Sequence, residues 1–151
     1  MRVAIAGATG FIGRALRGAL EDAAHEIIAL SRSASDRPGG ARTVWRSVNL
    51  FNLLHTERAL AGAEVAFYLV HAMHPSARLT QGRFDDLDLI CADNFARAAR
   101  AVGVRHIIYL GGIIPQGTEA LSDHLRSRLE VEQTLAAHGV PVTALRAALV
   151  V

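Results

Sequence analysis

The chain has 151 residues, of which 51% are apolar and 20% charged, a composition typical of one globular domain with a buried core. No apolar run approaches the ~20 residues that a membrane-spanning helix needs, so we expect no membrane partner. All 16 basic residues are arginines scattered along the chain, and the formal net charge is only +2. We therefore expect no nucleic-acid partner. The absence of lysine also excludes a lysine nucleophile or acid–base group within this chain.

Strand-type and helix-type patterns alternate along the chain. Short apolar runs predict six strands, at Val3–Ala6, Glu26–Leu30, Thr43–Val48, Val65–Val70, Val104–Leu110 and Val142–Val151. The intervening patterns predict helices at Phe11–Leu20, Gly82–Val102 and Glu119–Ala137, and a short helix or turn at Leu53–Leu60. Segments Ser31–Ala41 and Gly111–Thr118 contain proline and glycine and predict loops. Together these elements predict one α/β domain over residues 1–151, with a doubly wound parallel sheet in strand order 3-2-1-4-5-6.

The helix predicted at 82–102 has the clearest apolar stripe, with large or small apolar residues at steps of three and four. Cys91 lies on this stripe, so we expect it to pack in the core. As a lone cysteine it excludes an internal disulfide and fits a cytoplasmic protein. Asn94 interrupts the stripe, either as a core amide bonded to backbone or as part of a site. Trp45 is expected to pack against the sheet.

Three glycines, Gly7, Gly10 and Gly13, form the turn between the first predicted strand and the first predicted helix. This order lets the backbone approach a diphosphate closely and directs a helix N-terminus at it. The spacing is G-x-x-G-x-x-G rather than the commoner G-x-G-x-x-G. We therefore predict a dinucleotide site whose first contacts come from Gly7, Thr9, Gly10, Phe11, Ile12 and Gly13.

The end of the second predicted strand, Ser31-Arg32-Ser33, predicts which dinucleotide is bound. An acidic residue here would bind the ribose 2′-hydroxyl of NAD, whereas an arginine accommodates the 2′-phosphate of NADP. Arg32 can hold a phosphate in a charge-assisted, bidentate contact, and Ser31 can add a hydrogen bond. Arg14 could contribute further positive charge. The sequence therefore favours NADP over NAD, the alternative being that Arg32 is a solvated loop residue.

The run Gly7-Ala8-Thr9-Gly10-Phe11-Ile12-Gly13 resembles the opening of extended and atypical short-chain dehydrogenases/reductases. Residues 103–110 are similar to that superfamily's fifth strand, and residues 127–132 and 139–146 to its fifth helix and sixth strand. The resemblance covers the whole chain and is greatest to the NmrA-like branch, whose members bind NAD(P) with or without catalysis. It implies that Asn49 and Leu50 lie beside the adenine. It also implies that Leu69, Val70 and His71 line the ribose and nicotinamide side.

The chain departs from the superfamily at its catalytic positions. Alignment on the fifth helix places His124 and Arg128 where the resemblance implies a catalytic tyrosine and lysine. These positions lie one helical turn apart. The family's serine falls near Gly111-Gly112, which have no hydroxyl. Arginine does not release its proton, and histidine is a different acid from tyrosine. His124 is thus either a general acid near neutral pH or half of an exposed polar pair with Arg128.

Two histidines near the fourth predicted strand, His71 and His74, do not predict a metal site because no cysteine or carboxylate has matching spacing. The chain opens directly on a strand, so we expect no signal peptide. Superfamily members usually continue past the sixth strand into a part that closes over the substrate. We therefore expect a truncated domain that lacks this C-terminal substrate part and self-associates through its last, apolar edge strand.

Three functions stay open at this point. One is an NADP-dependent oxidoreductase or epimerase-like enzyme of unknown substrate. Another is a non-catalytic NADP-binding sensor or assembly factor, which the missing catalytic pair favours. A flavin or other mononucleotide binder fits the glycine turn and Arg32 less well.

Overall fold

A computed structural model describes residues 1–34, 37, 39–71, 84–114 and 122–148. Six strands are present in this part of the chain: β1 (Arg2–Ala6), β2 (Glu26–Ser31), β3 (Thr43–Ser47), β4 (Val65–Tyr68), β5 (His106–Gly112) and β6 (Val142–Ala147). Four helices connect them: α1 (Phe11–Asp22), α2 (Leu53–Leu60), α3 (Phe84–Ala101) and α4 (Asp123–Ala136).

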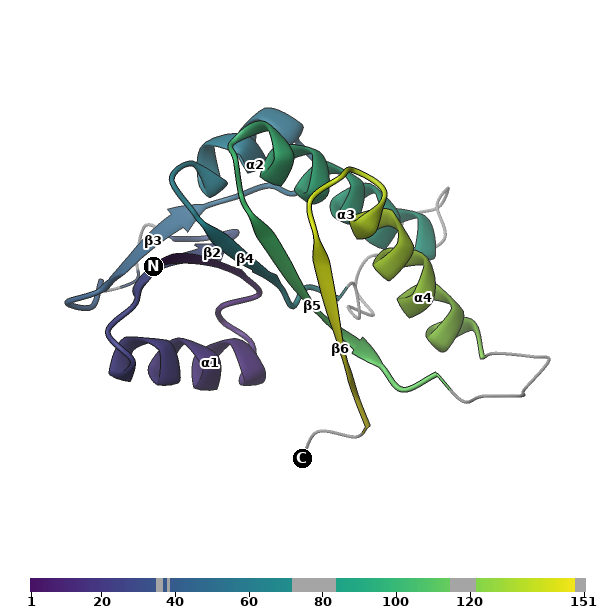
Figure 1. Ribbon diagram of the computed structural model, residues 1–151, viewed down its shortest axis with the longest axis horizontal. Coiled ribbons are helices and arrows are strands. Elements are labelled where there is room, and N and C mark those ends of the chain that lie inside the picture. The colour runs from purple at the N-terminus through teal and green to yellow at the C-terminus, as the bar shows by residue number, and fades with distance from the viewer. Residues whose placement is uncertain (35–36, 38, 72–83, 115–121, 149–151) are drawn as a thin grey trace.

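The strands form one sheet in the order β3-β2-β1-β4-β5-β6, and every neighbouring pair is parallel. Helix α1 covers one face of the sheet, and α2, α3 and α4 cover the other (Figure 1). The predicted doubly wound fold and strand order are therefore confirmed. Because all strands are parallel, their carboxyl ends meet along one edge of the sheet, where ligands of such folds bind.

Each face of the sheet has its own core. Alternate residues of β1 point to opposite faces, so Val3 and Ile5 pack with α1 while Ala4 and Ala6 pack toward α3. This double burial explains why the inner strands are continuous apolar runs. The buried face of α3 contains Phe95 and a series of alanines, at Ala92, Ala96 and Ala99, all of them fully buried. Small side chains let α3 approach the sheet closely.

The predicted bounds need correction near three strand ends. Gly111 and Gly112 belong to β5, not to a loop, because they pair with Arg146 and Ala147 of β6. Pairing with a neighbouring strand thus outweighs the low strand propensity of glycine. Strand β4 ends at Tyr68, before the predicted Val70, and β3 ends at Ser47, before Val48. The predicted helix start at Glu119 and strand end at Val151 lie outside the described residues.

Candidate functional site at the carboxyl ends of the strands

The glycine turn is packed so tightly that Gly7 and Gly13 leave no room for a Cβ atom. Gly7 has φ +89°, and a Cβ there would lie 2.9 Å from the carbonyl oxygen of Leu69. A Cβ on Gly13 would overlap the Gly7 carbonyl oxygen and lie 2.8 Å from the Cα of Ala8. The Gly10 amide donates to the Gly7 carbonyl at 3.0 Å, which closes the turn. The turn therefore holds α1 directly against the end of β1.

The first turn of α1 begins without a side-chain cap. Gly10 is the N-cap residue, its φ of −70° and ψ of 172° are extended, and no side chain accepts from the helix. The first turn also contains no acidic residue. The N–H groups at this helix end are thus left for an external acceptor, which is the arrangement that binds phosphate groups.

The end of β2 is built from serines around an exposed arginine. The Ser31 hydroxyl lies 3.3 Å from both the amide and the carbonyl of Ser33. The Ser47 hydroxyl donates to the Arg32 carbonyl at 3.1 Å, so the backbone of Arg32 is held between β2 and β3. Its side chain is exposed.

Beside this strand end lies an arginine cluster that sequence reasoning missed: Arg17, Arg37 and Trp45. The guanidinium carbons of Arg17 and Arg37 lie 5.1 and 5.0 Å from the centre of the Trp45 ring, within cation–π range. Arg37 Nε also donates to the Ser33 carbonyl at 3.2 Å. No ion pair to either arginine occurs among the described residues. The three residues are 8 to 28 positions apart along the chain, so only the aromatic Trp45 offered a sequence signal.

The other predicted cofactor residues follow β3 and β4 along the same edge. Asn49 is exposed, and its side-chain oxygen accepts from the Phe51 amide at 3.1 Å. Leu50 is half-buried, and its carbonyl accepts from the Asn94 amide group at 2.8 Å. Asn94, only 9% exposed, is therefore a core amide bonded to backbone. Its bond fixes the segment predicted to contact the adenine.

Leu69, Val70 and His71 follow β4 and are half-buried. The Leu69 amide donates to the Ala6 carbonyl at 3.0 Å, which ties this segment to the glycine turn. From β3 to β4 the predicted cofactor residues thus span three strand spacings, about 14 Å. The structure brings them together in one row along the sheet edge.

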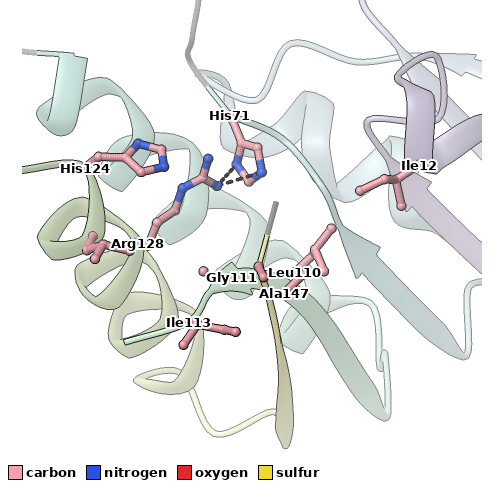
Figure 2. Close-up of a pocket in the computed structure, with 11 residues that line it drawn as sticks. Ile12, His71, Leu110, Gly111, Ile113, His124, Arg128 and Ala147 are labelled. Atoms are coloured by element: carbon pink, nitrogen blue, oxygen red, sulfur yellow. Dashed lines mark hydrogen bonds between the residues drawn. The ribbon is translucent and has the colours of Figure 1, made fainter. Parts of the chain in front are cut away.

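A pocket of about 390 Å³ opens where this row ends. Figure 2 shows Arg128 reaching from α4 to His71, with His124 beside it and Ile12 across the pocket. Its remaining walls are mostly apolar and come from the ends of β5 and β6 and from α4: Leu110, Gly111, Gly112, Ile113, Leu125, Ala147 and Ala148. Both predicted catalytic positions therefore line the pocket, together with His71 and the backbone of the two glycines.

The pair His71–Arg128 is the main polar contact in this pocket. Arg128 Nη1 donates to the imidazole, 2.6 Å from His71 Nε2 and also in contact with Nδ1. Burial, together with the charge of Arg128, lowers the pKa of His71 to about 4. A neutral imidazole can accept this hydrogen bond, so His71 holds the guanidinium without neutralising it.

Both tyrosines of the chain are in the core and do not line the pocket. Tyr68 is 1% exposed, and burial raises its pKa well above the usual value. Tyr109 is fully buried, and burial raises its pKa although the neighbouring Arg128 opposes this. The Tyr109 hydroxyl donates to the Arg128 carbonyl at 3.2 Å, which ties α4 to β5. Neither phenol is placed to exchange a proton with a pocket ligand.

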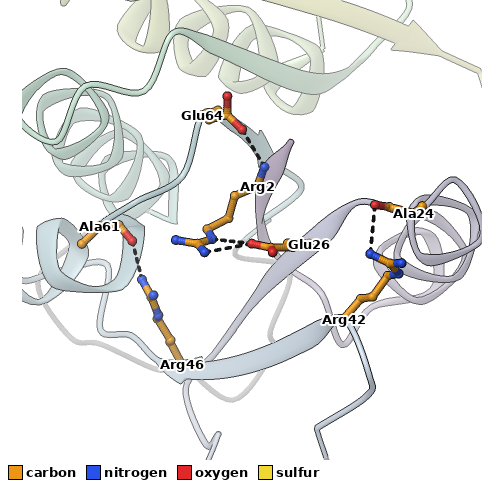
Figure 3. Close-up of polar contacts among 7 residues, drawn as sticks. All are labelled: Arg2, Ala24, Glu26, Arg42, Arg46, Ala61 and Glu64. Carbon is orange, nitrogen blue, oxygen red and sulfur yellow. Dashed lines mark hydrogen bonds and ion pairs between the residues drawn. The ribbon is translucent and has the colours of Figure 1, made fainter.

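The opposite edge of the sheet, at the amino ends of the strands, contains a second cavity of about 420 Å³ lined by charged side chains. Figure 3 shows the Arg2 guanidinium paired with Glu26 and the Arg2 backbone amide donating to Glu64, which also pairs with Arg105. Arg42 and Arg46 donate to the carbonyls of Ala24 and Ala61. These charges are paired with each other or with the ends of helices. This edge therefore stabilises the fold rather than offering free ligands.

Among the described residues, no three His, Cys, Asp or Glu side chains gather in an arrangement that could hold a metal. His74 lies outside the described residues, so its pairing with His71 stays untested. In the same part of the chain, no helix has the length and hydropathy needed to cross a bilayer.

A parallel sheet with a tight glycine turn between its first strand and first helix is the architecture of dinucleotide-binding domains. Residues 7–150 match the family model described as NAD(P)H-binding, so the chain belongs to this family. The resemblance to the atypical short-chain dehydrogenases/reductases is thereby confirmed.

This chain spans about half or less of the length of three relatives with similar sequence or fold. It is 30% identical over 142 residues to the auxiliary protein GraX of Staphylococcus aureus, covering 93% of this chain but 42% of GraX. The triphenylmethane reductase of Citrobacter sp., solved with NADP(H), matches with TM-score 0.77 and 24% identity over 99% of this chain and 50% of its own. The Bordetella bronchiseptica enzyme WbmG, solved with NAD, matches with TM-score 0.79 and 21% identity over 97% of this chain and 52% of its own.

Proposed function

We propose that this chain is the cofactor-binding part of an NADP(H)-dependent oxidoreductase, with the substrate bound in the pocket beside His71 and Arg128. The main support for the proposal is that the row of predicted cofactor residues leads directly into the pocket. The glycine turn and the row of cofactor residues end at Ile12 and His71, and these two residues also line the pocket. A dinucleotide along the row would thus place its nicotinamide at the pocket.

The preference for NADP is supported by the charge around the end of β2. Arg32 is exposed there, and Arg37 is bonded to the same segment through the Ser33 carbonyl. The nearest described carboxylate in sequence, Glu26, is paired with Arg2 at the other end of β2. A 2′-phosphate would meet positive charge here, whereas a 2′-hydroxyl would find no acidic acceptor among the described residues of this strand end.

When bound, the dihydronicotinamide would supply a hydride to an electrophilic carbon of the substrate. This chain's residues would orient the acceptor against Ile12 and the apolar wall, and Arg128 would stabilise negative charge that develops on the substrate oxygen. His124 is exposed, lies in the first turn of α4 and lines the pocket, and it would donate the proton that this oxygen takes up.

The cofactor preference can be measured with Trp45, the only tryptophan of the chain. Titration with NADPH and NADH, followed by Trp45 fluorescence, should give about 10- to 100-fold tighter binding of NADPH, as expected for one charge-assisted phosphate contact. Arg32→Ala should abolish the difference, whereas Arg97→Ala on the outer face of α3 should not. Tighter NADH binding, or unchanged NADPH binding by Arg32→Ala, contradicts the proposal.

A non-catalytic NADP(H) sensor is the second candidate, favoured by the burial of both tyrosines. Oxidation of NADPH with a panel of carbonyl and quinone acceptors separates the two functions, with His124→Ala as the control. Tight NADPH binding without oxidation by any acceptor favours the sensor. A cytoplasmic location is part of either proposal, supported by the buried free thiol of Cys91.

A further inference from the structure

The pocket beside the cofactor row is positively charged and contains no acid among its described lining residues. Its polar side chains are His71, His124 and Arg128, drawn together in Figure 2. The other side chains that line it are apolar. A pocket with one permanent positive charge and apolar walls favours a ligand with one anionic end.

Arg128 is the permanent charge of this pocket, and none of the ion pairs among the described residues includes it. Its side chain is half-buried and forms no ion pair there, in contrast to Arg2, Arg105 and Arg146, which pair with glutamates. Its guanidinium donates to the His71 imidazole, and its backbone carbonyl accepts from the Tyr109 phenol. Both of these groups are uncharged at neutral pH. A half-buried charge without a counter-ion is unfavourable, so the folded chain gains when an anion binds.

The guanidinium is also held in position before any ligand arrives. His71 at the end of β4 accepts from Nη1, and Tyr109 of β5 anchors the Arg128 backbone. One guanidinium nitrogen is thus engaged, which leaves other N–H groups of the planar fork available to a ligand. A carboxylate matches this fork with two parallel hydrogen bonds, which a hydroxyl or an amide cannot do.

We propose that the pocket binds a small organic carboxylate, with its carboxylate on Arg128 and its carbon skeleton against Ile12, Ile113 and Leu125. This proposal names the substrate class for the function proposed above and rests on it in that respect. His71 is a positioning residue in this arrangement, since it acts through Arg128.

Benzoate and its neutral analogue benzamide are suitable probes because they have nearly the same shape and differ in charge. Isothermal titration should show benzoate binding about 10- to 100-fold more tightly than benzamide, with and without saturating NADPH. Arg128→Gln should remove this preference, Arg128→Lys should retain part of it, and Arg97→Gln should leave it unchanged. Thermal unfolding of each variant checks that it is folded.

Equal binding of benzoate and benzamide overturns the proposal, as does a preference that survives in Arg128→Gln. The proposal is also overturned if no binding is detected when benzoate reaches millimolar concentration and a 50-fold molar excess over the protein. A His71→Phe variant that is folded but binds benzoate as the parent does refutes the positioning role alone. NADPH binding without benzoate binding refutes only this proposal, whereas benzoate binding without NADPH binding refutes only the proposed function.

Discussion

Replacement of Gly13 by alanine tests the packing of the glycine turn. The added Cβ would meet only backbone, namely the Gly7 carbonyl and the Cα of Ala8, which cannot move aside by changing rotamer. Overpacking of this kind costs about 1–3 kcal/mol, and we take the upper end because the backbone must shift. Higher helix propensity returns about 1 kcal/mol. The net loss in the free energy of unfolding is therefore about 2 kcal/mol.

Gly18 of the same helix is a matched control, since a Cβ there would meet nothing within 4 Å. Gly18→Ala should gain about 1 kcal/mol from helix propensity alone. For a domain of this size these changes correspond to a melting temperature about 4–8 °C lower for Gly13→Ala and about 2–4 °C higher for Gly18→Ala.

Both variants are measured by thermal unfolding under circular dichroism and by NADPH titration. Gly13→Ala should also weaken NADPH binding, because the displaced turn no longer presents its amides to a phosphate. Gly18→Ala should bind NADPH as the parent does. If the two variants have equal melting temperatures, the turn is looser than the structure describes and the reasoning fails.

Three further predictions concern other elements. Arg46 donates to the Ala59 and Ala61 carbonyls at the C-terminal end of α2, at 3.0 and 2.7 Å. Arg46→Gln removes these bonds and should lower the free energy of unfolding in urea by about 1–2 kcal/mol. An unchanged urea midpoint would show that these bonds do not stabilise the helix end. The His71 imidazole should titrate by NMR near pH 4, and because its folded pKa lies below the unfolded 6.5, stability should fall as the pH drops from 6.5 toward 4. A titration near 6.5 would contradict its burial. Leu145, 51% exposed on the edge strand β6, should promote self-association, so Leu145→Lys should reduce the mass measured by light scattering at high concentration. A parent chain that is a monomer at this concentration contradicts the prediction.

The sequence was sufficient for the elements whose signal is local. Gly7 and Gly13 predicted the turn because its geometry excludes side chains at those positions. The six apolar runs predicted the strand order because parallel connections leave few topologies open. The same local reasoning placed Gly111 and Gly112 in a loop, since the pairing with β6 that makes them a strand comes from residues more than thirty positions later.

The candidate site was predicted only in its linear parts. His71 and Arg128 were each singled out, but for separate roles, because a contact across 57 positions leaves no trace in spacing or periodicity. The arginines around Trp45 were missed for the same reason. Tyr109 is buried because α4 packs against the sheet. The apolar pattern of β5 predicts a buried strand but does not identify α4 as the element that covers Tyr109.

The cofactor row and the pocket are built on different strands. Residues predicted to hold the dinucleotide lie at the ends of β1 to β4, whereas most of the pocket wall comes from β5, β6 and α4. Only His71 and Ile12 belong to both. Substitutions at Ile113, Leu125 or Ala147 can therefore change the shape of the pocket without altering the residues predicted to contact the dinucleotide. Such a division would allow the pocket wall to change while the strand ends of the other half stay the same, and it makes the β5–β6 end the place to redesign selectivity.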